Sequence, residues 1–131
     1  MSPKAEQVTA NPDWYEPYNI SLGIRTENLI FLSGQAAVNE NGELIGKGDF
    51  NAQAEQVFKN QSKVLENAGS SLDDVVKVTI FLTDMSNFEK IIELREKYFS
   101  HPYPADTITE VNSLANPEWL IEIEAIAVVN N

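Results

Sequence analysis

Residues 119–129 read WLIEIEAIAVV, a stretch in which two sets of side chains alternate. Successive side chains of a β-strand point to opposite faces of a sheet, so this period of two predicts a strand. One face of the predicted strand is wholly apolar, whereas the other carries two acids. The apolar face consists of Trp119, Ile121, Ile123, Ala125, Ala127 and Val129, and the mixed face of Leu120, Glu122, Glu124, Ile126 and Val128.

Other segments carry strand signals of the same kind. Residues 28–36, NLIFLSGQA, are rich in branched and aromatic side chains and predict a buried strand, and residues 107–111 can form another. Between them, Asn41-Gly42 is a strong signal for a tight hairpin. Residues 75–83, VVKVTIFLT, alternate as well, with one face formed by Val76, Val78, Ile80 and Leu82 and the other by Val75, Lys77, Thr79 and Phe81.

Two segments have the period of a helix instead. Residues 52–68 carry one apolar stripe and are followed by Gly69, which suits a C-terminal cap. A second helix is predicted to start at the capping-box spacing of residues 86–89, SNFE, and to end before the prolines of residues 101–104, HPYP. The stripes are Ala54, Val57, Phe58, Gln61, Val64, Leu65 and Ala68 in the first helix, and Phe88, Ile91, Ile92, Arg95 and Phe99 in the second.

The order of these elements predicts an α+β fold, a mixed sheet with both helices on one face. A length of 131 residues indicates a single domain, residues 1–131, in which the proline-containing residues 1–17 form an N-terminal arm. The other face of the sheet would leave apolar side chains bare, which predicts contact with further copies of the chain. These side chains are Val75, Phe81, Leu120, Ile126 and Val128.

Composition excludes several classes of function. The net charge is −11, with nine Lys plus Arg against twenty Asp plus Glu, so nucleic acid is not the expected partner. The chain has no Cys and one His, His101, so we expect neither a disulfide nor a transition-metal site, and no cofactor. No apolar run approaches the length of a membrane span, and the N-terminus lacks the apolar region of a signal peptide. We therefore expect a cytoplasmic protein without a membrane partner.

A succession of short motifs resembles the Rid superfamily, the reactive intermediate deaminases, also called the YjgF or endoribonuclease L-PSP family. Ser33-Gly34-Gln35 follows an apolar strand, and residues 75–79, VVKVT, lead through residues 81–85, FLTDM. Tyr98-Phe99 then precedes Pro104-Ala105, and residues 121–127, IEIEAIA, close the chain. No single motif is specific, but their order and spacing together are. The resemblance covers about residues 22–128.

The resemblance implies a chorismate-mutase-like fold and a homotrimer with clefts between subunits. The best-known members hydrolyse imines and enamines of 2-oxo acids and use no metal or organic cofactor. In those members an Arg after Pro-Ala clamps the substrate carboxylate, a Glu of the last strand and backbone groups near Ser-Gly-Gln position the attacking water, and a Tyr lines the cleft. Ser33, Gly34 and Glu122 match these positions in the present chain.

Other positions depart from the pattern of the deaminases. Asp106 stands where the Arg is expected, and Ile108 stands where those members carry a Cys. The Tyr position falls on Ile20, two residues after Tyr18, and an Asn position of the second helix falls on Ile92. We therefore predict Ser33, Gly34, Asp106, Tyr18 and Ile108 as substrate-binding residues and Glu122 as the catalytic residue of a divergent member.

Several residues have two interpretations. Arg95 is either a relocated carboxylate clamp or one half of an ion pair at a helix end. Glu122 and Glu124 share a strand face about 7 Å apart. Either the two carboxylates share a proton or bind a cation, or one lies in the cleft and the other faces the subunit interface or a hydrogen-bond donor. Trp14, Tyr15 and Tyr18 either roof the cleft or pack the arm against the body of the protein.

Three classes of function remain open from the sequence. The first is an enzyme that hydrolyses an imine, an enamine or a related small metabolite, with Glu122 as a general base acting through water. The second is a non-catalytic trimer that binds a small molecule in the same cleft. The third, an endoribonuclease, is the weakest of the three because an acidic surface repels RNA.

Overall fold

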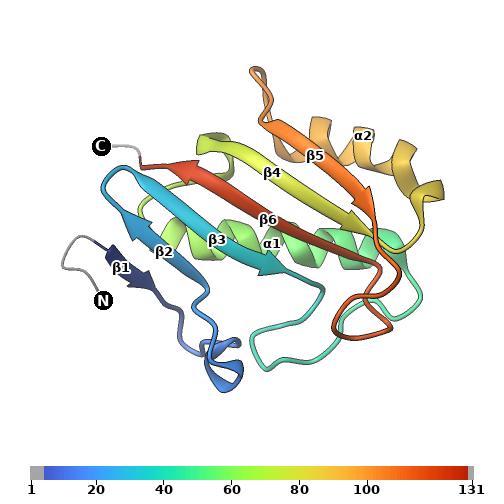
Figure 1. Cartoon of the computed structure of the whole chain (residues 1–131), viewed down its shortest axis with the longest axis horizontal. Coiled ribbons are helices and arrows are strands. Elements are labelled where there is room, and N and C mark those ends of the chain that lie inside the picture. Colours follow the sequence, from blue (N-terminus) through green and yellow to red (C-terminus); the bar gives the residue numbers. More distant parts are fainter. Residues whose placement is uncertain (1–4, 130–131) are drawn as a thin grey trace.

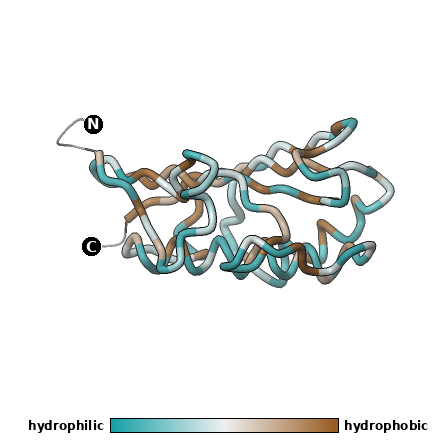
Figure 2. Tube along the Cα trace, turned by 90° about the horizontal axis from the view of Figure 1, so that it is seen from below, coloured by the Kyte–Doolittle hydropathy of each residue, from teal (hydrophilic) through white to brown (hydrophobic). Residues whose placement is uncertain are grey.

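Strand β6 (Ile121–Val128) lies in the centre of a six-stranded sheet in the computed structural model, which describes residues 5–129 (Figure 1). The helices α1 (Phe50–Asn67) and α2 (Phe88–Tyr98) cover one face of this sheet, and Figure 2 shows the two layers from the side. The predicted α+β architecture with two helices on one face is therefore confirmed. The remaining strands are β1 (Ala5–Val8), β2 (Gly23–Thr26), β3 (Leu29–Gln35), β4 (Val75–Leu82) and β5 (Ala105–Glu110), in the order β1-β2-β3-β6-β4-β5.

The sheet is mixed because only one pair of strands is parallel. β4 and β5 run parallel and are joined through α2, whereas every other neighbouring pair is antiparallel. A parallel pair needs a crossover connection, and the second helix provides it. β6, the last strand in the sequence, is inserted between β3 and β4, so its side chains contact both halves of the sheet.

The core lies between the sheet and the helices. The apolar face predicted for β6 is confirmed, because Ile121, Ile123, Ala125 and Ala127 are at most 4% exposed. Two fully buried glutamines of α1 fix the end of this strand. The Gln61 amide donates to the Ile123 carbonyl at 3.1 Å, and Gln53 bonds both the Glu118 carbonyl (2.9 Å) and the Leu120 N–H (2.8 Å). These bonds fix the position of the start of β6, and therefore of Glu122, relative to α1.

Helix α1 has the ends that its sequence encodes. The Asp49 side chain accepts from the Ala52 N–H at the start. At the other end Gly69 has φ +82°, and the N–H groups of Gly69 and Ser70 bond the carbonyls of Glu66 and Leu65. This pattern is a Schellman cap, which favours glycine at the left-handed position. The predicted helix and its Gly69 cap are confirmed.

Strand β4 differs from the predicted alternation at its first residues. Val75 is buried at 6% exposure, whereas Val76, predicted in the core, is 44% exposed. A register shift between Val75 and Lys77 explains the error, since Val75 pairs with Ala127 and Lys77 with Ile126. A β-bulge of this kind adds a residue to one strand and reverses the faces on one side of it.

Helix α2 starts later than predicted and is less buried. The predicted cap at Ser86 is wrong: the Asp84 side chain accepts from the Ser86 N–H at 2.9 Å, and a 3-10 turn precedes the helix. Within the predicted stripe Ile91 is buried, whereas Phe88 and Ile92 are exposed. α2 lies at the margin of the sheet, by the edge strand β5, whereas α1 packs against the central strands β3 and β6 (Figure 1).

Much of the predicted N-terminal arm is part of the body of the protein. Ala5–Val8 forms β1, which pairs antiparallel with β2, and both Trp14 and Tyr15 are buried. Residues 1–4 of the predicted arm lie outside the described residues. Within residues 5–129, no helix is long and apolar enough to cross a membrane.

Candidate functional site

A pocket of about 600 Å3 lies at one end of the sheet, where four segments of the chain converge. The segment before β2 supplies Trp14, Tyr15 and Tyr18, and the end of β3 supplies Ser33 and Gly34. The 38–44 hairpin, the loop before β6 and β6 itself complete the walls, the last through Glu122 and Glu124. The pocket therefore brings together Tyr18, Ser33, Gly34 and Glu122, four of the six predicted site residues.

The floor of this pocket is a bulge at the end of β3. Leu32 pairs with Ala125 and Gln35 with Ile123, so Ser33 and Gly34 together oppose Glu124 alone. A bulge re-aims the backbone and disturbs the regular ladder of hydrogen bonds. The Ser33 hydroxyl donates to the Ser21 carbonyl, which ties the bulge to the segment before β2.

Gly34 allows the Glu122 carboxylate to lie directly against this bulge. A Cβ atom at residue 34 would overlap a carboxylate oxygen of Glu122, so any larger residue would displace the acid. Tyr15 also stabilises this bulge, because its hydroxyl donates a hydrogen bond to the Gly34 carbonyl. Burial, and then the charge of Glu122, raise the pKa of Tyr15, so the phenol keeps the proton that it donates. The alternating pattern of side chains carries no signal for this bond.

Glu122 has the electrostatic environment of a proton acceptor. Its side chain is half-buried, and desolvation raises the pKa of its carboxyl above the ordinary 4.5, with a further contribution from the charge of Glu124. Glu124 lies on the same face of β6 and is exposed. A carboxylate with a raised pKa is a stronger base than one free in water, which suits proton transfer near neutral pH.

Asp106 and Ile108 lie elsewhere in the subunit. In the β4–β5 pair Asp106 is opposite Val78 and Ile108 is opposite Ile80, whose side chains are buried in the core on the helix side. Glu122 lies on the other face of the sheet. Within one subunit, therefore, Asp106 and Glu122 do not share a pocket.

Asp106 instead forms an ion pair with Arg95 of α2. The Arg95 Nε donates to Asp106 Oδ2 at 2.9 Å, and the two side chains are only 26% and 17% exposed. This is the ion-pair interpretation of Arg95. The second oxygen, Oδ1, is buried without a hydrogen-bond partner among the described residues. The pair lines a separate cavity of about 520 Å3 together with Ile92 and Tyr103.

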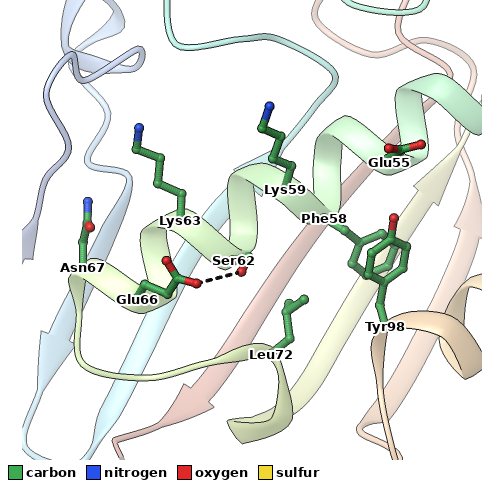
Figure 3. Close-up of a pocket in the computed structure, with 9 residues that line it drawn as sticks. All are labelled: Glu55, Phe58, Lys59, Ser62, Lys63, Glu66, Asn67, Leu72 and Tyr98. Carbon is green, nitrogen blue, oxygen red and sulfur yellow. Dashed lines mark hydrogen bonds between the residues drawn. The ribbon is translucent and has the colours of Figure 1, made fainter.

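A third cavity, of about 590 Å3, lies on the outer surface of α1 (Figure 3). Phe58 and Tyr98 stack there with ring centroids 4.2 Å apart, and the rim is formed by exposed side chains such as Lys59 and Glu55. Acids and bases both occur along this face of the helix, which is the pattern of a solvated surface. Among the residues that the structure describes, no three His, Asp or Glu side chains gather closely enough to hold a metal ion.

Comparison with known proteins agrees with this architecture. Residues 8–129 match the sequence model of the family described as endoribonuclease L-PSP. A RutC family protein of Pyrococcus abyssi is 44% identical over 112 residues, which are 85% of either chain. A protein of Dermatophagoides farinae named 2-iminobutanoate/2-iminopropanoate deaminase is 32% identical over 130 residues, covering 98% of this chain and 99% of the relative.

A crystal structure of a Rid family protein of unknown function from Yersinia pestis, YyfA, superimposes with a TM-score of 0.86. Its sequence identity is 32%, and the match covers 95% of this chain and 99% of that one. The chain therefore belongs to the endoribonuclease L-PSP family, the Rid superfamily.

Proposed function

We propose that the protein hydrolyses the C=N bond of a small imine, or of the imine tautomer of an enamine, with Glu122 as the general base. The observation that carries this proposal is the position of the Glu122 carboxylate, half-buried in a pocket and packed against the Gly34 bulge. Relatives that bear the name of an imine deaminase support the same reaction class. The alternative is a small-molecule-binding protein that kept the pocket without the reaction.

The reaction needs one water and one proton shuttle. The ionised Glu122 accepts a proton from water while the water oxygen bonds to the imine carbon and gives a carbinolamine. Glu122 returns that proton to the nitrogen, then takes the carbinolamine hydroxyl proton and passes it to the nitrogen as the C–N bond breaks, and the carbonyl compound and ammonia leave. General base catalysis of this kind contributes about 10²–10⁴-fold to a rate. Tyr15 takes no part in the proton transfer, but it holds the carbonyl of the bulge against which Glu122 packs.

The enzyme and the binding protein are distinguished by turnover. Imines generated in place from an amine and a carbonyl compound, or by an amino-acid dehydratase, are mixed with the purified protein, and release of carbonyl product and ammonia is followed. We expect release at least ~10²-fold faster than in buffer for imines that lack a carboxylate. Ligand binding without any acceleration of release would contradict the enzymatic proposal and favour the alternative.

We also propose that the working unit is a homotrimer with its clefts between subunits. The open face of the sheet carries exposed apolar side chains, with Leu29 opposite Val128 and Phe31 opposite Ile126 across β3 and β6. Bare apolar patches of this kind mark interfaces. A cleft that contains both Asp106 and Glu122 requires a second copy, because the two acids lie on opposite faces of one sheet.

Light scattering coupled to size exclusion is expected to give three times the chain mass of 14.6 kDa. Phe31→Asp, which places a charge on the open face, is expected to yield the monomer mass, because an unpaired charge is costly to bury. The control Lys59→Asp changes charge on the outer surface of α1 and should leave the mass unchanged. A monomer mass for the native chain at micromolar concentration would contradict the trimer.

A further inference from the structure

We propose that the Glu122 pocket selects cationic ligands, and that its substrate class is therefore a protonated imine rather than an imino acid anion. The substrate class rests on the proposed function, whereas the selection of cations rests on the pocket alone. Aromatic rings and carboxylates line the pocket together. This combination is the one by which proteins recognise organic ammonium groups.

The aromatic walls come from two places in the chain, the segment before β2 and the loop before β6. Trp14 and Tyr15 lie in the segment before β2, Tyr18 follows them, and Trp119 precedes β6. The Trp14 ring is fixed, because it is 4% exposed and its Nε1 donates to the Oε1 of the buried Gln35 at 3.0 Å. Tyr18 is 68% exposed and lies at the rim. Aromatic rings that line a pocket attract a cation through the ring quadrupole.

Within one chain the charge of the pocket has one sign. Glu122 and Glu124 both line it, and no Lys, Arg or His is among its described lining residues. Lys77, on the same face of the sheet, lines the neighbouring groove with Glu124 and donates to the Thr107 hydroxyl at 2.8 Å. Glu124 raises the pKa of Glu122, so the two carboxylates repel each other. A bound cation would relieve that repulsion.

Trp119, which also lines the pocket, carries a buried polar atom without a partner in the part of the chain that the structure describes. Its indole Nε1 is buried and has no hydrogen-bond partner among the described residues. Buried polar groups normally have partners, and an orphan of this kind marks a place where an external group or water completes the bonding. The indole N–H is a donor only. A ligand or water oxygen that reached this atom would accept its hydrogen bond.

A protonated imine fits both the charge and the reaction. Its carbon is more electrophilic than that of the neutral imine, and its positive charge lies on the nitrogen beside the carboxylates. One water and one protonated imine give one carbonyl compound and one ammonium ion, so atoms and charge balance. Glu122 takes the proton from water and returns it to the nitrogen, then takes the carbinolamine hydroxyl proton as the C–N bond breaks and passes it to the leaving ammonia, which departs as ammonium.

Three probes of matched shape test the selection: choline, its uncharged carbon analogue 3,3-dimethyl-1-butanol, and the anion 3,3-dimethylbutanoate. Both tryptophans of the chain line this pocket, so tryptophan fluorescence reports occupancy directly. We expect choline to bind at least tenfold more tightly than the alcohol, and the anion to bind more weakly than either. Equal affinity for all three probes, or preference for the anion, would overturn the inference.

Variants locate the site. Glu122→Gln and Glu124→Gln are each expected to weaken choline binding at least threefold, because each removes one carboxylate from the pocket. Glu55→Gln makes the same change of charge on α1, in the cavity of Figure 3, and should not alter it. Choline affinity that is equal in all three variants would contradict the proposed pocket. Choline binding without imine turnover would refute the enzymatic function and support the cation site. Imine turnover without a preference for cations would refute the cation site and support the enzymatic function.

Discussion

Replacing Glu122 by Gln is expected to slow imine hydrolysis about 10²–10⁴-fold. Gln has nearly the same shape as Glu, so it keeps the packing against Gly34 but cannot accept a proton at neutral pH. The measurement is release of carbonyl product by the native protein and the variant under identical conditions. A variant that retains the native rate would remove Glu122 from the mechanism.

Thermal unfolding separates this loss from a loss of folding. The pKa of Glu122 is raised in the folded protein, so its contribution to stability is greatest below the unfolded pKa and is lost as pH rises through the folded pKa. At neutral pH the buried carboxylate thus costs stability, and Gln removes that cost. Glu122→Gln should therefore unfold at the native temperature or above it.

Glu124→Gln is the matched variant, because it makes the same change two residues away on an exposed side chain. We expect less than a tenfold loss of rate. The ionised form of Glu122 is the active one, so the native rate should rise with pH through a value above 4.5. Removing the charge of Glu124 lowers the pKa of Glu122, and the rise should move to lower pH. An unchanged pH profile in this variant would show that the rise of the rate with pH reflects the titration of another group.

The regular parts of the fold follow from periodic patterns in the sequence. The sequence predicts two elements at the positions where the structure has them: the alternating strand of residues 121–127 and the apolar stripe of α1 with its Gly69 cap. Burial dictates the side-chain type at most of those positions. The order of elements then restricts the layers to one arrangement. The regular parts of the molecule were therefore predictable.

The irregular parts of the fold were not predictable from such patterns, and the site is built from them. The bulge at Val75 reversed one face of β4, and the bulge at Ser33-Gly34 placed Glu122 against backbone. A bulge inserts one residue into a strand without a sequence pattern of its own, so alternation misassigns residues next to it. The bond from Tyr15 to Gly34 spans nineteen residues and is a tertiary contact. The family resemblance, rather than periodicity, pointed to Ser33, Gly34 and Glu122.

Asp106→Arg is expected to raise kcat/KM for 2-iminobutanoate or 2-aminoacrylate about a hundredfold over the native protein. The resemblance to the deaminases puts an Arg at this position, where it pairs with the substrate carboxylate. At ~4 Å and an effective dielectric of ~20, the attraction between the two charges is about 4 kcal/mol, and an Asp gives a comparable repulsion. Screening leaves a difference of ~3 kcal/mol, which corresponds to more than a hundredfold in binding.

Arg95 decides how the experiment is designed. In the native protein its guanidinium pairs with Asp106 at 2.9 Å, so Asp106→Arg would place two guanidinium groups side by side. The double variant Asp106→Arg with Arg95→Gln removes that repulsion and should show the larger gain. Asp106→Asn is the control, because it removes the negative charge and releases Arg95 without adding the paired donors of a new guanidinium.

The dehydratase assay distinguishes the causes. Keto-acid release by the native protein as fast as by Asp106→Arg would refute the charge argument. A full gain in Asp106→Asn would identify the released Arg95 as a sufficient clamp, since its guanidinium lies against residue 106. A gain confined to the variants with Arg at residue 106 would show that the guanidinium must extend from that residue of β5. Arg95 of α2 would then serve only to neutralise Asp106 in the native protein.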